Sequence, residues 1–460
     1  MKIKVGKTEL IHFVGIGGIG MSGLALIMDS LGFKIQGSDL SDNKYLNNLR
    51  KRKIPIYLNH NKKNIKNCTV LVISSAIKKT NPEYKQALKL NLPIYKRGEL
   101  LGHIVSLMKN IVVTGSHGKT TTTSILSNIL NCARLDPTII NGGVLNSIGS
   151  SAKLGKSDWS LIESDESDGS FLKIPFNYAI VTNIDNEHLD YYKNIENLKN
   201  KFIEFIDKTP SLGKTLLCLD DKNIKKILSK IKNKNYYTYG LDKKSNFYIY
   251  NITQNQNNSK FDVRIQIPGK KKTIKNIFIP LLGLHNIKNA TSALSVAFSI
   301  GVSDKIIKFG LKNFKGVQRR FNFLFYKNNS SFFDDYAHHP TEISSVLDGV
   351  KKVYKKEEIV CIFQPHRISR LKNLKIEFSK CFKNADTILL CPIYKAGENI
   401  SLGFSYNSFA KLLAKNSNVD LIMLKNELDL KKTVKNLAFG NKIFIAMGAG
   451  SVSNWVRSLN

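Results

Sequence analysis

Two glycine-rich loops, each lying between an apolar strand and a helix, constrain the fold of this chain more than any other feature. The first loop runs from Gly15 to Gly20 after the apolar segment Leu10–Val14. The second runs from Gly115 to Thr121 after Ile111–Thr114. Glycine permits the tight turn from strand to helix, and the helix N-terminus then faces the loop. Such units are typical of parallel α/β sheets.

The length of 460 residues exceeds what one hydrophobic core usually serves, so several domains are expected. Short apolar strands alternate with helical stretches in three blocks, which predicts domains at residues 1–107, 108–316 and 317–460. In the middle block, apolar and polar residues alternate from Phe247 to Leu282, which predicts a small antiparallel part beside a mostly parallel sheet.

The net charge of +35 is the most unusual feature of the composition. The lysines are spread over the whole chain without an aromatic-interleaved basic stripe, so no nucleic-acid partner is expected. No run approaches the roughly 20 apolar residues that span a bilayer, and the N-terminus lacks a signal-peptide core. The six cysteines form no Cys-x-x-Cys pair and are interpreted as reduced thiols. A cytoplasmic protein without membrane insertion is therefore expected.

The second glycine loop carries the most chemistry. Its sequence is Gly115-Ser116-His117-Gly118-Lys119-Thr120-Thr121. Backbone N–H groups of the loop can face phosphate oxygens, the lysine can reach the β- and γ-phosphates, and the first threonine can hold Mg²⁺. The loop has two residues rather than four between its glycines, so an ordinary strand-to-helix turn is the alternative. The strand before it and the helix after it favour binding of ATP.

Two acidic segments follow neighbouring strands of the middle block. Glu163–Asp168 comes directly after Trp159–Ile162, and Asn183–Asp190 comes directly after Ile180–Thr182. Ligands gather at the carboxyl ends of parallel strands, which places both segments near the second loop. Either segment alone fits a solvated acidic turn. Together they favour sites for a divalent metal.

The first glycine loop resembles a dinucleotide-binding fingerprint, and Asp39 ends the second strand, where such proteins hold a ribose. An NAD-dependent oxidoreductase is therefore an alternative, as is a non-enzymatic nucleotide-sensing or nucleic-acid-binding module. A nicotinamide enzyme has no need of a second phosphate loop with Lys119 and metal-ready acids. The two loops together indicate two ligands that carry phosphate.

Eight motifs follow one another along the chain: Gly15–Gly23, Thr114–Thr122, Glu163–Asp168, Gly283–Ala290, Arg319–Phe321, Asp334–Pro340, Gln364–Arg367 and Met447–Ser451. This series resembles that of the Mur ligases, most closely the branch that adds L-alanine to UDP-N-acetylmuramate. The match runs in order from residue 10 to residue 451. Ser116 and Ser164 stand where Thr and Ala are expected.

The resemblance implies a Rossmann-like N-terminal domain that binds the UDP-sugar, a central P-loop ATPase-like domain that binds ATP, and a Rossmann-like C-terminal domain that binds the amino acid and part of ATP. It implies ATP-dependent ligation of L-alanine to the lactyl carboxylate of UDP-N-acetylmuramate through an acyl phosphate, which starts the peptide of the peptidoglycan precursor. ATP and Mg²⁺ are the implied cofactors. A ligase of the same family that recycles a preformed peptide is the nearest alternative, and the sequence carries no indication of oligomeric state.

The resemblance also implies roles for single residues. The residues implied to bind the UDP-sugar are Gly17, Gly18, Gly20, Asp39, Ser74 and Ser75. Those implied to bind ATP are Gly115, Ser116, His117, Gly118, Lys119, Thr120, Thr121, Asn289, Arg320 and Asp335. Those implied to bind Mg²⁺ are Thr120, Glu163 and His188, and those implied to bind the amino acid are His366, Arg367 and Arg370. Lys119, His188 and Arg320 are the implied catalytic groups, and His366 is a candidate acceptor for the proton of the amine.

Overall fold

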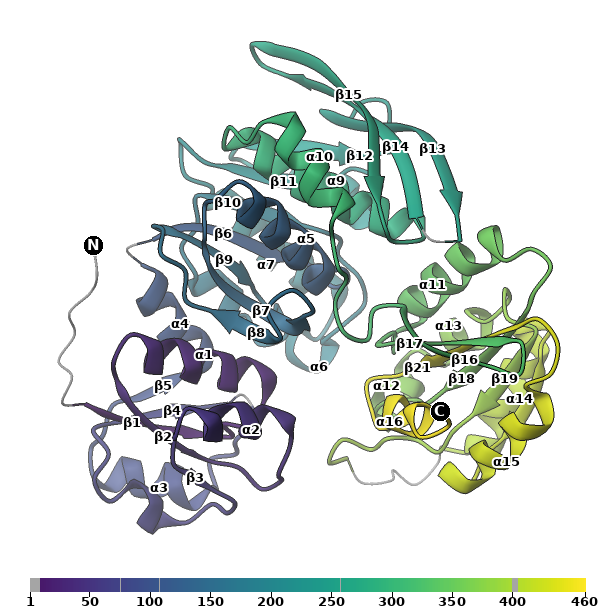
Figure 1. Cartoon of the computed structure of the whole chain (residues 1–460). Helices are drawn as coiled ribbons and strands as arrows, with labels where there is room; N and C mark the ends of the chain where they lie inside the picture. Colours follow the sequence, from purple (N-terminus) through teal and green to yellow (C-terminus); the bar gives the residue numbers. More distant parts are fainter. Residues whose placement is uncertain (1–8, 75, 107, 257, 399–403) are drawn as a thin grey trace. The chain divides into compact units, whose positions relative to one another are not determined.

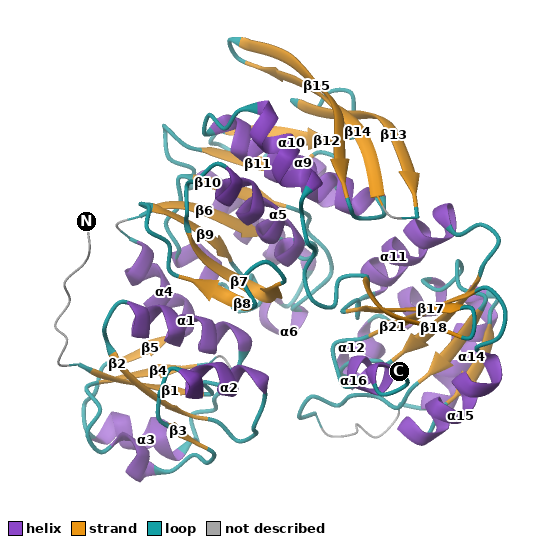
Figure 2. Ribbon diagram, viewed as in Figure 1, coloured by secondary structure: helices purple, strands orange, loops and turns teal. Residues whose placement is uncertain are grey.

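The computed structural model describes residues 9–74, 76–106, 108–256, 258–398 and 404–460. Its strands form three sheets of five, ten and six strands (Figures 1 and 2). No helix among the described residues is long and apolar enough to cross a membrane.

The chain divides into two compact units. The first unit holds the five-stranded sheet and most of the ten-stranded sheet, and comprises Met1–Ile252, Phe261–Ile279 and Lys288–Lys315. The second unit holds the six-stranded sheet and comprises Thr253–Lys260, Pro280–Ile287 and Gly316–Asn460.

The N-terminal sheet is entirely parallel and has the order β3-β2-β1-β4-β5. Strand β1 lies at its centre, with β2 and β3 on one side of it and β4 and β5 on the other. The point where the order of the strands reverses in this way is where ligands bind in α/β sheets. The strands are β1 (Leu10–Val14), β2 (Lys34–Ser38), β3 (Ile56–Tyr57), β4 (Val70–Ile73) and β5 (Ile94–Lys96). The helices are α1 (Ile19–Ser30), α2 (Lys44–Lys51), η1 (Lys62–Ile65), α3 (Pro82–Lys89) and α4 (Arg97–Val105).

The central sheet has the order β15-β14-β13-β12-β11-β10-β6-β9-β7-β8. Strands β7, β9, β6, β10, β11, β12 and β13 pair in parallel, and β8 is antiparallel to β7. The strands are β6 (Lys109–Thr114), β7 (Thr138–Leu145), β8 (Ser150–Lys153), β9 (Trp159–Glu163), β10 (Tyr178–Val181), β11 (Lys214–Cys218), β12 (Tyr236–Gly240), β13 (Phe247–Asn255), β14 (Asn258–Ile267) and β15 (Lys270–Ile279). The helices are α5 (Lys119–Cys132), η2 (Ser170–Lys173), α6 (Leu189–Tyr192), α7 (Ile195–Asp207), α8 (Lys222–Ile227), α9 (Leu284–Ser299) and α10 (Asp304–Lys312).

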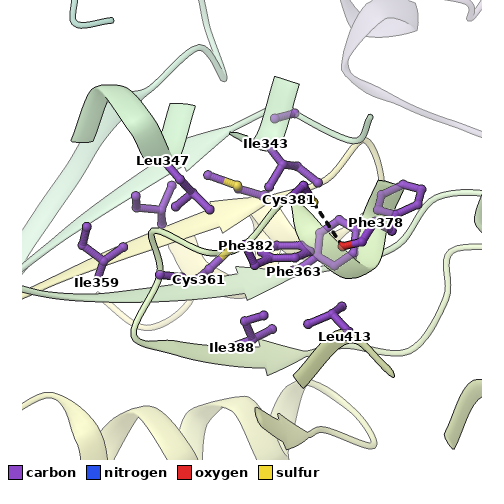
Figure 3. Packing of buried hydrophobic residues seen from close by; sticks show 14 of the residues in the cluster. Ile343, Leu347, Ile359, Cys361, Phe363, Phe378, Cys381, Phe382, Ile388 and Leu413 are labelled. Atoms are coloured by element: carbon purple, nitrogen blue, oxygen red, sulfur yellow. Dashed lines mark hydrogen bonds between the residues drawn. The ribbon is translucent and has the colours of Figure 1, made fainter. Parts of the chain in front are cut away.

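The C-terminal sheet has the order β16-β17-β21-β18-β19-β20, with only β16 antiparallel to its neighbour. On one face of the sheet Ile343 and Leu347 of α11 pack with Phe363, Phe378 and Phe382 in a fully buried cluster (Figure 3). The strands are β16 (Asn322–Lys327), β17 (Ser330–Asp335), β18 (Glu358–Phe363), β19 (Thr387–Leu390), β20 (Asp420–Met423) and β21 (Lys442–Met447). The helices are α11 (Pro340–Val353), α12 (Ile368–Asn373), α13 (Lys375–Lys380), α14 (Tyr406–Ser417), α15 (Glu427–Leu437) and α16 (Val452–Arg457).

The predicted fold class is confirmed: the chain is α/β, its three sheets are mostly parallel, and the antiparallel part is small. Both glycine loops connect a buried strand to a helix, β1 to α1 and β6 to α5. Five strands were not predicted, namely β7, β8, β11, β12 and β16. Strands β8 and β16 lie at the edges of their sheets and β7 lies next to β8, whereas β11 and β12 lie inside the central sheet between β10 and β13.

Candidate active site

The second glycine loop is shaped by left-handed backbone at both of its glycines. Gly115 has a φ of 123° and Gly118 a φ of 80°, and Gly118 is the residue before α5. A Cβ atom at Gly118 would lie 2.7 Å from Oδ1 of Asn289, so the side chain of α9 packs directly against the loop. Glycine is therefore required at residue 118 on two grounds, its backbone conformation and the close approach of Asn289.

Lys119 begins α5 and its side chain folds back over the loop. Its Nζ donates to the carbonyl oxygens of Gly115 at 2.5 Å and Ser116 at 3.1 Å, and to Oε2 of Glu166 at 2.8 Å. Burial lowers the pKa of Lys119, but the carboxylates of Glu166 and Asp165 more than offset this and raise it above its ordinary value. The loop therefore holds a permanent positive charge at its centre.

The segment after β10 braces the same loop. Asn183 accepts hydrogen bonds from the backbone N–H groups of Ser116 and His117, and Nε2 of His117 lies 2.9 Å from Oδ2 of Asp185. The hydroxyl of Ser116 in turn accepts from the N–H of Asp185 at 2.8 Å. The predicted proximity of this segment to the loop is therefore present, through Asn183 and Asp185 rather than through its histidine.

Three side chains from the two acidic segments form a cluster beside Lys119. Asp165, Glu166 and His188 each offer one ligand atom, and these atoms lie within 4.8 Å of one another. The Glu166 carboxylate is fully buried, and its Oε1 accepts no hydrogen bond from any described residue, although Nε2 of His188 lies 3.6 Å away. His188 has a left-handed φ of 58°, a strained conformation that is common where a side chain must be aimed.

The charges of this cluster are strongly coupled. Burial raises the pKa of Glu166, against the opposing charge of Lys119. Burial also acts to raise the pKa of Asp165, but the positive charges of Lys119, His188 and Arg97 hold it below its ordinary value. Asp165 is therefore a carboxylate at neutral pH. A buried carboxylate oxygen without a hydrogen bond, next to a second carboxylate and an imidazole, is a donor set suited to a divalent cation.

Thr120 and Glu163 lie together on the other side of the loop. The threonine hydroxyl donates to Oε1 of Glu163 at 2.9 Å, and the N–H of Gly142 donates to Oε2 at 2.5 Å. Adjacent oxygen ligands of octahedral Mg²⁺ are also about 2.9 Å apart, given metal–oxygen distances of about 2.0–2.1 Å. The two oxygens are thus spaced as neighbouring ligands of one such ion would be.

Two side chains from the connection between β2 and α2 hold the first glycine loop. Oδ2 of Asp39 accepts from the N–H of Gly17 at 2.8 Å, and Nδ2 of Asn43 donates to the Gly17 carbonyl at 3.2 Å. Ser74 lies against the loop, since a Cβ atom at Gly15 would be 3.1 Å from the Cβ of Ser74. Ser75, also predicted for this site, lies outside the described residues.

A buried polar network around Glu83 holds the end of β2, next to this loop. The carboxylate of Glu83 on α3 accepts from Oγ of Ser38 at 2.6 Å, from Nδ2 of Asn64 at 2.7 Å and lies 3.1 Å from Nδ1 of His60. Burial acts to raise the pKa of Glu83, but His12 and Ser38 hold it below its ordinary value. Ser38 directly precedes Asp39, so the network fixes the end of β2 from which Asp39 reaches the loop.

Replacing Glu83 by alanine is expected to lower the free energy of unfolding by about 3–5 kcal/mol, because buried donors lose the charged acceptor they share. Urea denaturation measures this, with Asp42→Ala as the control: Asp42 pairs with Arg50 at the surface of the same domain. Because the pKa of Glu83 is lowered by folding, its contribution is present above the ordinary carboxyl pKa and is lost as the pH falls through the lowered value. Equal stability of the two variants would contradict this role.

In the second unit, Arg320 lies in a turn with left-handed residues on both sides. Arg319 has a φ of 59° and Phe321 a φ of 48°. The two oxygens of Asp335 accept from the N–H groups of Phe321 at 2.8 Å and Ala337 at 2.7 Å, and burial raises the pKa of Asp335 to about 6. The Arg320 guanidinium lies 3.8 Å from Glu342. Asp335 thus holds the turn that presents Arg320.

His366, Arg367 and Arg370 lie together at the start of α12. Nη1 of Arg370 is 3.2 Å from Nδ1 of His366, whose ring stacks on Tyr394 with a centroid distance of 5.5 Å. Burial, with the positive charges nearby, lowers the pKa of His366 to about 3. Arg367 is exposed and has a left-handed φ of 68°. A histidine with so low a pKa is a weak base, which argues against His366 as the acceptor of a proton from an ammonium group.

Sequence reasoning missed several residues of these sites. Glu166 and Asp165 stand inside a quoted motif, but only Glu163 was given a role. Asn183 and Asp185 were noted only as part of an acidic segment, and Arg97 was not noted at all. The acidic residues directly follow β9, and this position alone could have indicated that they belong to the site. Their order along the chain does not indicate which of them is buried.

The two loops and the carboxylates around Lys119 define an α/β protein that handles more than one phosphate-bearing ligand. Comparison with known families agrees in every part of the chain. Residues 10–109 match the Mur ligase family catalytic domain, residues 113–297 the Mur ligase middle domain, and residues 319–450 the Mur ligase glutamate ligase domain. The chain belongs to the Mur ligase family.

Individual relatives narrow the comparison. The chain is 62% identical over all of its length to a UDP-N-acetylmuramate–L-alanine ligase of Pelagibacter ubique, covering 99% of that protein, and 39% identical over its length to one of Bartonella bacilliformis, covering 97%. A crystal structure of the Thermotoga maritima UDP-N-acetylmuramate–alanine ligase superposes with a TM-score of 0.82 at 28% identity, over 98% of this chain and 97% of that one. A murein peptide ligase from Psychrobacter arcticus shares the fold, with a TM-score of 0.72 at 23% identity and 98% coverage of both chains.

Proposed function

We propose that this chain joins the amino group of L-alanine to the lactyl carboxylate of UDP-N-acetylmuramate while ATP is converted to ADP and phosphate. The single observation that carries the proposal is the Lys119 loop, which places a permanent cation beside a cluster of carboxylates. The full-length identity to proteins with this activity supports it. NAD-dependent hydride transfer is not favoured, because a nicotinamide enzyme has no use for this second loop.

The chemistry follows from the poor reactivity of a carboxylate toward amines. The lactyl carboxylate attacks the γ-phosphorus of ATP, an acyl phosphate forms and ADP leaves. The alanine amine then attacks the acyl carbon and phosphate leaves. Lys119 would neutralise the transferring phosphoryl group, and Arg320 would add a second positive charge.

Mg²⁺ fits two sets of residues around the loop. Thr120 and Glu163 would hold one ion, and Glu166, Asp165 and His188 would hold another. The bare, buried Oε1 of Glu166 is the observation that supports the second site. When bound, Mg²⁺ supplies charge neutralisation to the phosphate oxygens of ATP.

We assign the three substrates to the three domains. Residues 1–107 would bind the UDP-sugar through Gly17, Gly18, Gly20, Asp39, Ser74 and Ser75. Residues 108–316 would bind ATP through the loop from Gly115 to Thr121 and through Asn289. Residues 317–460 would bind the amino acid through His366, Arg367 and Arg370, with Arg320 and Asp335 reaching ATP. Since ATP and nucleotide-sugars are cytoplasmic metabolites, the reaction would take place in the cytoplasm.

The proposal is tested by phosphate release from ATP in the presence of UDP-N-acetylmuramate and one candidate amine at a time. L-Alanine, glycine, L-serine and a tripeptide are compared, with omission of the sugar nucleotide as the blank. We expect release that requires both the sugar nucleotide and L-alanine. Release with the tripeptide but not with L-alanine would instead assign a peptide-recycling ligase, and NADH oxidation without ATP turnover would assign an oxidoreductase.

Arg370→Ala is expected to raise KM for the amino acid by about tenfold to a hundredfold and to leave KM for ATP within twofold. A guanidinium that binds a carboxylate contributes about 1.5–3 kcal/mol through charge-assisted hydrogen bonds. Steady-state phosphate release with each substrate varied in turn measures both constants. The control is Lys372→Ala on the same short helix. An equal rise in both constants would show that Arg370 does not contact the amino acid.

A further inference from the structure

Arg97 lies directly against the first glycine loop although it comes 77 positions after Gly20 in the sequence. It is the first residue of α4. A Cβ atom added at Gly20 would lie 3.1 Å from Nη1, 3.3 Å from Cδ and 3.5 Å from Cζ of Arg97. The guanidinium and its stem therefore cover the first turn of α1. Any side chain at residue 20 would displace them, which explains why glycine stands at this position of the loop.

The side chain of Arg97 is half-buried, and among the described residues it forms no hydrogen bond and no ion pair within 4 Å. A guanidinium carries five N–H donors and no acceptor. Donors that no described acceptor occupies are suited to an anionic ligand.

The start of α1 adds further donors at the same place. Gly18 precedes the helix, no side chain caps its N–H groups, and its first turn contains no acidic residue. The first N–H groups of a helix have no partner within the helix and carry partial positive charge. The Arg97 side chain therefore lies beside the first turn of α1, next to these N–H groups.

The helix that begins with Arg97 also packs against the segment that carries the carboxylates. A Cβ atom at Gly98, the residue after Arg97, would lie 2.6 Å from the Cβ of Ser170. Ser170 follows Asp165 and Glu166, which belong to the cluster beside Lys119, in the same stretch of chain. Helix α4 therefore contacts both the first glycine loop and the segment after the acidic residues.

We propose that Arg97 binds the diphosphate of the sugar nucleotide, together with the N–H groups at the start of α1, and so orients the sugar toward the Lys119 loop. This inference rests on the proposed function for the identity of the nucleotide. A diphosphate offers several charged oxygens to the planar fork of a guanidinium, which binds phosphate through two parallel N–H···O bonds. The diphosphate is not a reacting group and would be held equally before and during the reaction. Arg97 would therefore contribute to binding of the sugar nucleotide more than to kcat.

The test uses Arg97→Met, which keeps the apolar stem over Gly20 and removes the donors, and Arg97→Lys, which keeps the charge and removes the fork. Calorimetry with UDP alone and steady-state phosphate release are measured on the full-length protein. We expect Arg97→Met to weaken UDP binding and raise KM for the sugar nucleotide about tenfold to a hundredfold, the scale of lost charge-assisted hydrogen bonds. KM for ATP and kcat should change less than threefold, and Arg97→Lys should fall between the two.

The control is Arg52→Ala, an exposed arginine of the same sheet region whose only close carboxylate is Asp29 at 3.7 Å. Its UDP affinity should equal that of the unmodified protein. If Arg97→Met binds UDP normally, or lowers kcat and ATP affinity equally, the assignment is overturned. Thermal denaturation identifies a variant that has lost its fold, in which case Arg97→Lys decides. If the unmodified protein binds UDP through Arg97 but releases no phosphate with L-alanine, the proposed function fails while the assignment of Arg97 stands.

Discussion

Lys119→Met is expected to abolish ligation, lowering kcat by about a thousandfold or more, while UDP binding changes less than twofold. Removing a positively charged side chain that contacts the transferring phosphoryl group lowers kcat by about this factor. Lys119 Nζ is held by the carbonyls of its own loop, which fixes the position of its charge. The first glycine loop, which we propose to bind UDP, follows β1 of a different sheet, so UDP binding should persist. Phosphate release and calorimetry with UDP measure the two effects.

The same substitution is also expected to destabilise the fold. It leaves the Glu166 carboxylate buried without the cation that lies 2.8 Å from it, and breaking a buried pair in this way costs about 3–5 kcal/mol. The double variant Lys119→Met, Glu166→Gln removes both charges and should recover most of the stability in urea denaturation. Its activity should stay absent. Recovery of ligation in the double variant would show that the lysine acts only by balancing Glu166.

Much of the fold follows from local patterns in the sequence. The central parallel strands are short apolar runs bounded by turn residues, and β1, β4 and β9 lie where those runs predict them. Both glycine loops were recognised because tight strand-to-helix turns require glycine, and Gly115 and Gly118 do adopt left-handed backbone. These features depend on residues that are close in sequence, which is why the sequence alone shows them.

Two of the missed strands, β7 and β16, lack such local signals. Strand β7 contains Asn141-Gly142-Gly143, a run that is typical of turns, and it is held in place by pairing with β9 and β8. Strand β16 is antiparallel to β17 and contains a register shift between Phe323 and Phe325, so its alternation is broken. In both cases tertiary pairing overrides local propensity.

The candidate site was harder to predict than the fold, because side-chain direction beyond a strand end is not periodic. Glu163, Asp165 and Glu166 follow one another closely, yet Glu163 contacts Thr120 whereas Glu166 contacts Lys119. Only the path of the backbone after β9 decides this. Arg97 shows the same limit, since its contact with Gly20 joins two helices that are distant in the sequence.

Glu166→Gln is expected to raise the Mg²⁺ concentration for half-maximal turnover at least tenfold and to lower kcat about a hundredfold. The substitution removes the negative charge of the oxygen that has no hydrogen bond, Oε1, from the cluster with Asp165 and His188. Replacing a residue that only positions a metal ligand lowers metal affinity or activity by about tenfold to a hundredfold. Replacing the ligand itself should have an effect at least as large. Lys119 keeps its two carbonyl acceptors and the nearby charge of Asp165, so the loss of stability should be smaller than in Lys119→Met, and urea denaturation of Glu166→Gln measures it.

Asp168→Asn is the matched control, because Asp168 lies in the same acidic segment but accepts only from the backbone N–H of Ser170. Phosphate release is measured from micromolar to millimolar Mg²⁺, and binding of Mg²⁺ is followed separately by calorimetry. Asp168→Asn should respond to Mg²⁺ as the unmodified protein does. If both variants show the same Mg²⁺ dependence, the bare oxygen of Glu166 is not a metal ligand, and its burial serves only to anchor Lys119. If Glu166→Gln loses Mg²⁺ binding while UDP binding is kept, the charge of Glu166 serves the metal as well as the lysine.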